Sequence, residues 1–189
     1  MSDPLTAEEK QTLLRLARQA LELSVRGKKL PPLDRNLLTP SLRADGASFV
    51  TLTAGGELRG CIGALEAYQP LAEDVREHAV AAAREDYRFP PVQAAELDSI
   101  HVEVSRLTAP VPLAYSSPDD LIAKLRPHVD GVVLRDGTRR ATFLPQVWDK
   151  LPRPEDFLAN LCYKMGAAPD LWKHKHLDAR VYRVDEFHE

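Results

Sequence analysis

The sequence has little of what marks membrane proteins, disulfide-rich proteins and metalloproteins. Its 189 residues include two cysteines, Cys61 and Cys162, which lie too far apart for a disulfide framework or for paired zinc ligands. No apolar run approaches the roughly 20 residues that a membrane-spanning helix needs. Residues 1–4 begin acidic, without the basic segment of a secretory signal peptide. These absences predict a cytoplasmic protein with reduced thiols and no membrane partner.

An excess of positive charge is also missing. Lysine and arginine number 25 against 28 acidic residues, so the formal net charge is -3. Nucleic-acid affinity comes mainly from cationic side chains that neutralise phosphates, so we expect no nucleic-acid partner. The common signatures of nucleotide-binding proteins, serine hydrolases and zinc peptidases are absent. With 44% hydrophobic and 28% charged residues, the chain fits one globular domain, or one domain in two lobes.

The most informative stretch is residues 58–63, which read Leu-Arg-Gly-Cys-Ile-Gly. It follows an apolar run at 49–53, with two glycines between, and this pattern predicts a β-hairpin over about 48–65. Two further glycines inside the second strand predict a bulge, or a place where another backbone or a ligand comes close. Alternation along the strand predicts that Arg59 and Cys61 share one face.

Hydrophobic periodicity divides the rest of the chain into helices and strands. A capping box at Thr6 opens the first helix, and Pro70 opens another that must end before Pro90. Asp136 and Gly137 form a hairpin turn signal. The expected helices cover 6–27, 70–89, 117–125 and 154–165; the expected strands cover 99–107, 131–135, 140–144 and 179–187; a proline-rich connector covers 28–40.

The order of these elements predicts the fold class. Strands and helices mix without a repeating β-α-β order, and two strand pairs are hairpins, so we expect an α+β fold with antiparallel sheets. A proline-rich join near Pro110 and a second join after Trp172 predict a smaller subdomain inserted into a larger one. The larger would comprise 1–109 and 176–189, and the smaller 110–175.

Five motifs together carry a family resemblance. They are LRGCIG at 58–63, DYRFPP at 86–91, VS at 104–105, LPQV at 144–147 and LCYKMG at 161–166. This set resembles the AMMECR domain, the A component of the AmmeMemoRadiSam system, over nearly the whole chain. Tyr87 and Met165 stand where members commonly have proline and alanine. The resemblance implies two subdomains, each with a small antiparallel sheet and flanking helices, and LRGCIG facing a cleft between them. It also implies a Memo-like protein and a radical-SAM protein as partners.

Cys61 is the first candidate for chemistry, as a nucleophile or thiol ligand. A thiolate performs both roles, and a neighbouring arginine favours the thiolate. The alternative is a small buried thiol between two glycines. Arg59 and Arg88 are candidates for a clamp on a substrate anion, because a guanidinium binds carboxylate or phosphate through two bonds. Alternatively they form internal ion pairs, Arg88 with Asp86 or Arg59 with Glu103.

Other polar residues extend the candidate set. Glu103 lies on the polar face of its strand and is a candidate general base, or else a solvated side chain. Gly60 and Gly63 would line the substrate site with the two arginines, and Gln146 would reach it from the inserted subdomain. His174 and His176 have the spacing of a metal half-site but no further ligands nearby, so no metal site is predicted. The sequence identifies no cofactor.

Two functions follow from these candidates. The first is an enzyme that binds an anionic organic substrate or a modified peptide in the cleft between the subdomains, with Cys61 reacting and the arginines anchoring the anion. The second is a non-catalytic protein-binding module that acts with Memo-like and radical-SAM partners. The enzymatic hypothesis depends on the thiol of Cys61 and the guanidinium of Arg59 being presented together.

Overall fold

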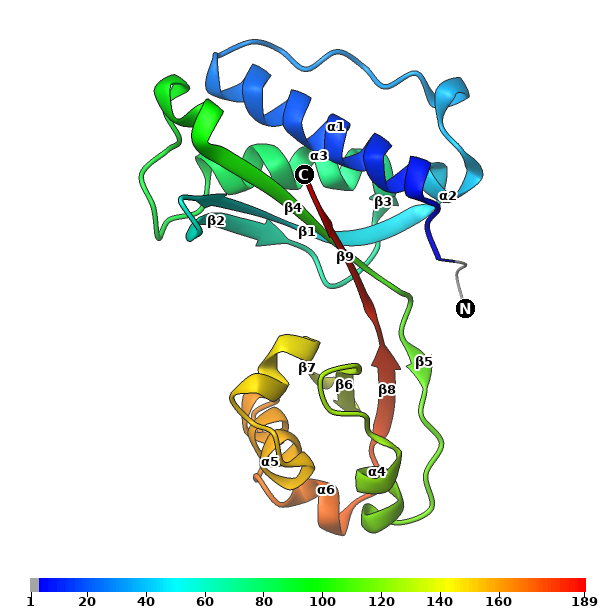
Figure 1. The fold of residues 1–189 in the computed structure, drawn as a ribbon. Helices are drawn as coiled ribbons and strands as arrows, with labels where there is room; N and C mark the ends of the chain where they lie inside the picture. Colours follow the sequence, from blue (N-terminus) through cyan, green and yellow to red (C-terminus); the bar gives the residue numbers. More distant parts are fainter. Residues whose placement is uncertain (1–3) are drawn as a thin grey trace. The chain divides into compact units, whose positions relative to one another are not determined.

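The computed structural model describes residues 4–189, so Asp3, the acidic residue of the N-terminal segment noted above, lies outside it (Figure 1). The protein forms two compact units. The larger unit comprises the described residues up to Leu107 together with Asp185–Glu189, and the smaller comprises Thr108–Val184. Within the described residues, no helix is both long enough and apolar enough to cross a membrane.

The larger unit is a sheet covered on one face by helices. Its strands follow the order β2-β1-β4-β9, with β3 also paired to β1, and β1 runs antiparallel to β2, β3 and β4. Helices α1 and α3 pack on each other and against the sheet (Figure 1). The elements are α1 (Ala7–Val25), η1 (Arg35–Leu37), α2 (Pro40–Arg43), β1 (Asp45–Ala54), β2 (Glu57–Gly63), β3 (Gln69–Pro70), α3 (Leu71–Arg84), η2 (Ala94–Ser99), β4 (Ile100–Leu107) and β9 (Val184–His188).

Alternation along the strands decides which side of this sheet is the core. Val50 and Leu52 of β1 and Val102 of β4 are fully buried in the cluster that α1 and α3 complete. The residues between them in sequence therefore face the other way. We call this side, which carries Thr51, Glu103 and their neighbours, the outer face of the larger sheet.

The smaller unit has its own sheet and its own core. The strand order is β5-β8-β6-β7. The core centres on Trp148, whose ring stacks on Phe157 with centroids 3.7 Å apart and whose indole N–H donates to the Asp130 carbonyl at 2.8 Å. The elements are β5 (Val111–Pro112), α4 (Pro118–Lys124), β6 (Gly131–Asp136), β7 (Arg139–Phe143), η3 (Pro145–Asp149), α5 (Pro154–Lys164), α6 (Leu171–His174) and β8 (Asp178–Tyr182).

The structure confirms the α+β class with two antiparallel sheets, and it differs from the sequence analysis at the C-terminal end. The strand expected at 179–187 is two strands, β8 and β9, separated at Arg183 and belonging to different sheets. Because β8 pairs with β5 and β6, the chain returns to the larger unit at Asp185 and not at residue 176. Apolar residues lie on both sides of Arg183, at 182 and 184, and no glycine or proline marks the change of sheet.

Candidate functional site

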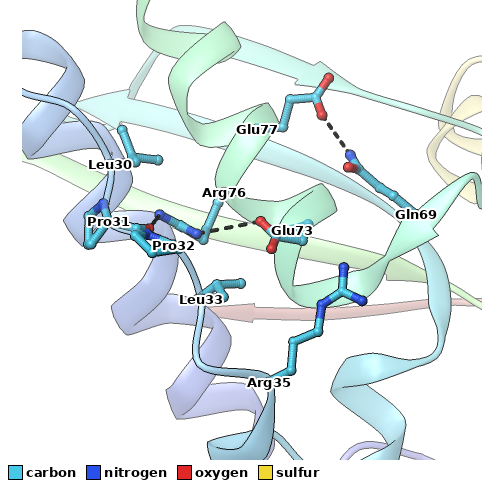
Figure 2. Close-up of a pocket in the computed structure, with 9 residues that line it drawn as sticks. All are labelled: Leu30, Pro31, Pro32, Leu33, Arg35, Gln69, Glu73, Arg76 and Glu77. Carbon is cyan, nitrogen blue, oxygen red and sulfur yellow. Dashed lines mark hydrogen bonds and ion pairs between the residues drawn. The ribbon is translucent and has the colours of Figure 1, made fainter.

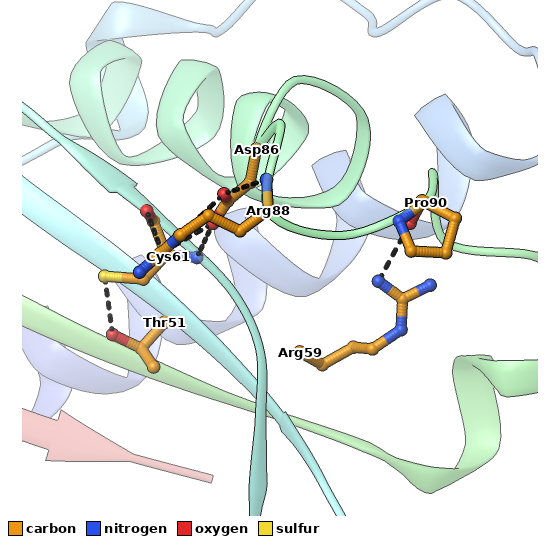
Figure 3. A network of polar contacts seen from close by, with 6 residues as sticks. All are labelled: Thr51, Arg59, Cys61, Asp86, Arg88 and Pro90. Atoms are coloured by element: carbon orange, nitrogen blue, oxygen red, sulfur yellow. Dashed lines mark hydrogen bonds and ion pairs between the residues drawn. The ribbon is translucent and has the colours of Figure 1, made fainter.

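The LRGCIG motif forms β2, at the edge of the larger sheet, and contains the bulge that its glycines predicted. Leu52 of β1 pairs with Gly60, but the next residue, Thr53, pairs with Leu58. Arg59 is therefore the extra residue that a β-bulge inserts, and a bulge redirects side chains. The Arg59 guanidinium and the Cys61 thiol point in different directions (Figure 3). The expectation that the two groups are presented together is wrong.

Arg59 is engaged within the protein. Its Nε and Nη2 atoms donate to the two carboxylate oxygens of Glu96 at 2.8 and 3.1 Å, and its Nη1 donates to the Pro90 carbonyl at 2.9 Å. This pairing lowers the pKa of Glu96. The expected internal ion pair exists, but its partner is Glu96 and not Glu103. A two-bond ion pair that also holds a loop carbonyl fixes the segment around Pro90 onto the bulge.

Both glycines of the motif allow other parts of the larger unit to approach. A Cβ at Gly60 would lie 2.2 Å from the carbonyl oxygen of Ala82 in α3, and one at Gly63 would lie 2.4 Å from the ring of Phe49. The predicted close approach at Gly60 is therefore that of the protein's own helix. Their assignment to a substrate site stays a prediction.

Asp86 and Arg88 hold the free edge of β2 at Cys61. Asp86 accepts the backbone N–H of Cys61 at 2.9 Å, and Arg88 donates to the Cys61 carbonyl at 3.3 Å (Figure 3). The two side chains also bind each other through two hydrogen bonds, of 2.9 and 2.7 Å. They thus supply a donor and an acceptor where a further strand would otherwise pair. The alternative in which Arg88 pairs with Asp86 is confirmed.

The ion pair between Asp86 and Arg88 shifts the pKa of both groups, but only Arg88 is exposed. Hydrogen bonds from Arg88 hold the pKa of Asp86 far below its usual range, and the same contact raises the pKa of Arg88. The Asp86 side chain is buried, whereas that of Arg88 is 45% exposed. The Arg59 side chain is only 14% exposed. Of the two candidate anchors, Arg88 is the one that a ligand can reach.

Cys61 presents its thiol on the outer face of the larger sheet. The side chain is half-buried, and the Thr51 hydroxyl donates to its sulfur at 3.3 Å. Thr51 pairs with Cys61 on one side and with Glu103 on the other, so the three residues form a row across β2, β1 and β4. The fully buried thiol that was the alternative for Cys61 is found instead at Cys162, where burial raises the pKa.

Glu103 is the carboxyl group of this row. It is half-buried, and burial raises its pKa, with a smaller contribution from the negative charge of Glu186. A carboxyl whose pKa is raised keeps its proton to a higher pH than an ordinary glutamate does. A raised pKa also makes the carboxylate a stronger base, which suits the predicted role of a general base.

The remaining candidates lie in the smaller unit. Gln146 is in η3, and its assignment to a substrate site stays a prediction. His174 lies 3.4 Å from Asp170, and the His176 ring stacks on Tyr115 with centroids 4.3 Å apart. Over residues 4–189, no three histidine, cysteine or acidic side chains are grouped as a metal ion would need.

The sequence patterns did not indicate two residues of the site, Thr51 and Glu96. Thr51 contacts the thiol because the hairpin register pairs it with Cys61. Glu96 pairs with Arg59 because η2 begins there with a capping box, in which Glu96 also accepts the N–H of Gln93 at 2.7 Å. The usual capping-box signal has serine or threonine at its first position, where this chain has Gln93. The sequence therefore indicated neither the helix start nor the arginine partner.

A family model, related sequences and a solved structure each match nearly the whole chain. A family model described as AMMECR1 matches residues 14–187. A protein of Methanothermobacter thermautotrophicus is 43% identical over 98% of this chain and 97% of its own length, and one of Thermofilum pendens is 42% identical over 95% and 88%. The crystal structure of an uncharacterized protein from Pyrococcus horikoshii is similar with a TM-score of 0.79 and 33% identity, covering 98% of this chain and 93% of that one.

Proposed function

The chain belongs to the AMMECR1 family, and from the geometry of its site we propose that it is a thiol-dependent enzyme acting on an anionic organic substrate or a modified peptide. In this proposal the substrate lies on the outer face of the larger sheet. Cys61 is the nucleophile, Glu103 exchanges a proton with the substrate, and the exposed part of Arg88 attracts the anion. The cleft implied by the family resemblance stays a prediction.

One observation carries the proposal: an accessible thiol and a carboxyl with a raised pKa lie in one row of the sheet. Neighbouring strands are about 4.8 Å apart, so Cys61 and Glu103 are separated by roughly twice that distance. The carboxyl is too far away to deprotonate the thiol directly. The gap over Thr51 is wide enough for a substrate group to contact both residues. Nucleophile and proton-transfer group would then act on different atoms of one substrate.

The reactivity of the thiol tests this proposal. Iodoacetamide labelling at pH 7.5, followed by mass spectrometry of each cysteine, compares Cys61 with buried Cys162 and with free glutathione. We expect Cys61 to react faster than both, because its sulfur is accessible and Cys61 lies beside the Thr51 hydroxyl and the Arg88 guanidinium, whereas the Cys162 thiol is buried. An Arg88→Gln variant should slow the reaction of Cys61. A rate no higher than that of glutathione would remove the nucleophile from the proposal.

A non-catalytic binding module is the second candidate function, and a specific observation favours it. Arg59 and Arg88 make internal ion pairs, and Gly60 and Gly63 leave room for neighbouring parts of the protein. Much of the LRGCIG motif therefore already has a structural role. The partners in this case are a Memo-like protein and a radical-SAM protein. The expected cytoplasmic location and the lack of a nucleic-acid partner also stay predictions.

A Cys61→Ser variant separates the two functions. Purified Memo-like and radical-SAM proteins are tested for binding to the wild type and to the variant by pull-down. A docking surface should keep its partners at unchanged affinity, because serine has nearly the shape of cysteine. An enzyme should lose turnover and any partner retention that depends on a covalent intermediate at Cys61.

A further inference from the structure

A cavity of about 470 Å³ lies in the larger unit, away from the Cys61 row. It opens between the connector that follows α1, strand β3 and helix α3 (Figure 2). Its volume is within the range of roughly 300–1,000 Å³ in which proteins bind small molecules. The lining residues are Leu30, Pro31, Pro32, Leu33, Arg35, Gln69, Glu73, Arg76 and Glu77.

One wall of the cavity is apolar and held in place. Leu30 and Leu33 are half-buried and pack against the core of the larger unit. Arg76 of α3 donates to the Pro31 carbonyl at 2.6 Å, which ties the connector to the helix. The two prolines limit the conformations of this segment further. A wall that is fixed before binding lowers the entropy cost of binding a ligand.

Two arginines supply the positive charges of the cavity: Arg76 is buried and paired, and Arg35 is exposed. Arg76 is 5% exposed, and it lies 3.4 Å from Glu73 in an ion pair. The Nε atom of Arg76 is buried and has no hydrogen-bond partner in residues 4–189. Arg35 is exposed, and among those same residues its side chain makes no hydrogen bond or ion pair. Arg35 is thus a free cation at the rim.

The negative charges come from α3. Glu77 accepts hydrogen bonds from the Tyr68 hydroxyl at 3.3 Å and from the Gln69 amide at 2.7 Å. Both donors are neutral, so they orient the carboxylate without cancelling its charge. Glu73 shares the long contact with Arg76. Figure 2 shows Arg35 and Glu77 on opposite sides of the cavity.

We propose that this cavity binds a small zwitterion, a free α-amino acid or a dipeptide. The carboxylate of the ligand binds Arg35, because a guanidinium forms two parallel bonds with a carboxylate. The ammonium group binds Glu73 and Glu77, and the apolar side chain lies against Leu30 and Leu33. A purely anionic ligand would leave both glutamates facing its charge. No residue of the Cys61 row lines the cavity, so this site is independent of the proposed thiol chemistry.

An NMR titration of the full chain with leucine and with leucylleucine tests the proposal. We expect saturable shifts of the amides that line the cavity, with at least one of the two probes binding below about 10 mM. Two capped forms measure the contribution of each charge: acetylation removes the ammonium group, and amidation removes the carboxylate. Each cap should weaken binding of the dipeptide by about tenfold or more.

Variants identify the cavity as the binding site. Arg35→Gln should weaken binding of leucylleucine by about tenfold, yet should leave the weak binding of its amide unchanged, because the amide has lost the group that Arg35 binds. Arg15→Gln is the matched control, since Arg15 is an exposed arginine of α1 that does not line the cavity. Absence of saturable binding, equal affinities of the two variants, or equal affinities of capped and uncapped dipeptides would overturn the proposal.

Discussion

At the scale of single residues, Asp86 holds Cys61 of the LRGCIG motif from outside the motif. Its carboxylate accepts the N–H of Cys61, and it binds the guanidinium that contacts the carbonyl of the same residue. The thiol is therefore positioned by a side chain 25 residues away in sequence. Arg88 is oriented by the same carboxylate, so the charge near the thiol depends on Asp86 as well.

We predict that Asp86→Ala destabilises the protein by about 1–3 kcal/mol, because the Cys61 N–H and the Arg88 guanidinium both lose their partner. Urea unfolding at pH 7 measures the change. Glu85→Ala is the matched control, since Glu85 is exposed and adjacent, and it should change stability by less than about 0.5 kcal/mol. Equal effects of the two variants would contradict the assigned role of Asp86.

The stabilisation by Asp86 should depend on pH. Because hydrogen bonds from Arg88 lower its pKa in the folded protein, the folded state binds fewer protons at this site than the unfolded state does. The contribution is therefore complete above the unfolded pKa of about 3.9 and is lost as the pH falls below it. The difference in unfolding free energy between wild type and Asp86→Ala should be smaller at pH 3 than at pH 7. A difference that is constant with pH would show that the carboxylate charge contributes nothing.

At the scale of elements, the contact between β2 and α3 explains why a strand contains glycine at position 60. Ala82 is one of a series of alanines that bring α3 close to the sheet, and its carbonyl oxygen occupies the space of a Cβ at Gly60. The alanines of α3 and the glycine of β2 together allow the helix and the strand to approach this closely. This contact also sets the position of β2, and with it that of Cys61.

We predict that Gly60→Ala destabilises the protein by about 1–3 kcal/mol or more, because the added methyl group meets backbone, which cannot rotate away. Urea unfolding measures the loss. An added Ala82→Gly substitution should not restore stability, since the clash is with the carbonyl oxygen of residue 82 and not with its side chain. Recovery in that double variant would show that the helix does not approach as closely as described.

At the scale of the whole molecule, the two units have separate hydrophobic cores. The core of the larger unit is built from α1, α3 and the inner faces of β1 and β4, and that of the smaller unit is built around Trp148 and Phe157. The Cys61 row and the charged cavity both lie in the larger unit. Damage to the smaller core should therefore be separable from damage to these sites.

We predict that Phe157→Ala, which empties a fully buried position stacked on Trp148, costs about 3–5 kcal/mol of stability in the smaller unit. Hydrogen exchange followed by mass spectrometry should show faster exchange mainly within Thr108–Val184. Leu13→Ala, in the larger core, is the matched variant and should accelerate exchange mainly in the other unit. Uniform acceleration in both variants would mean that the two cores unfold as one.

The sequence by itself determined the elements that rest on local patterns. The capping box and helical spacing identified α1, alternation identified β4, and the glycine turn identified the β1–β2 hairpin. These patterns are local because a helix or strand repeats its buried side every few residues. The bulge in β2 was also predicted, since glycine inside a strand weakens regular pairing.

Only the tertiary structure decided which groups meet. The bulge turned Arg59 away from Cys61 and toward Glu96. Arg88, which Asp86 orients, contacts Cys61 instead. The run expected as one closing strand became β8 and β9 in different sheets. Strand pairing and helix packing join residues that are distant in sequence, and alternation is the same whichever sheet a strand enters. The partners of a side chain are therefore a property of the folded chain.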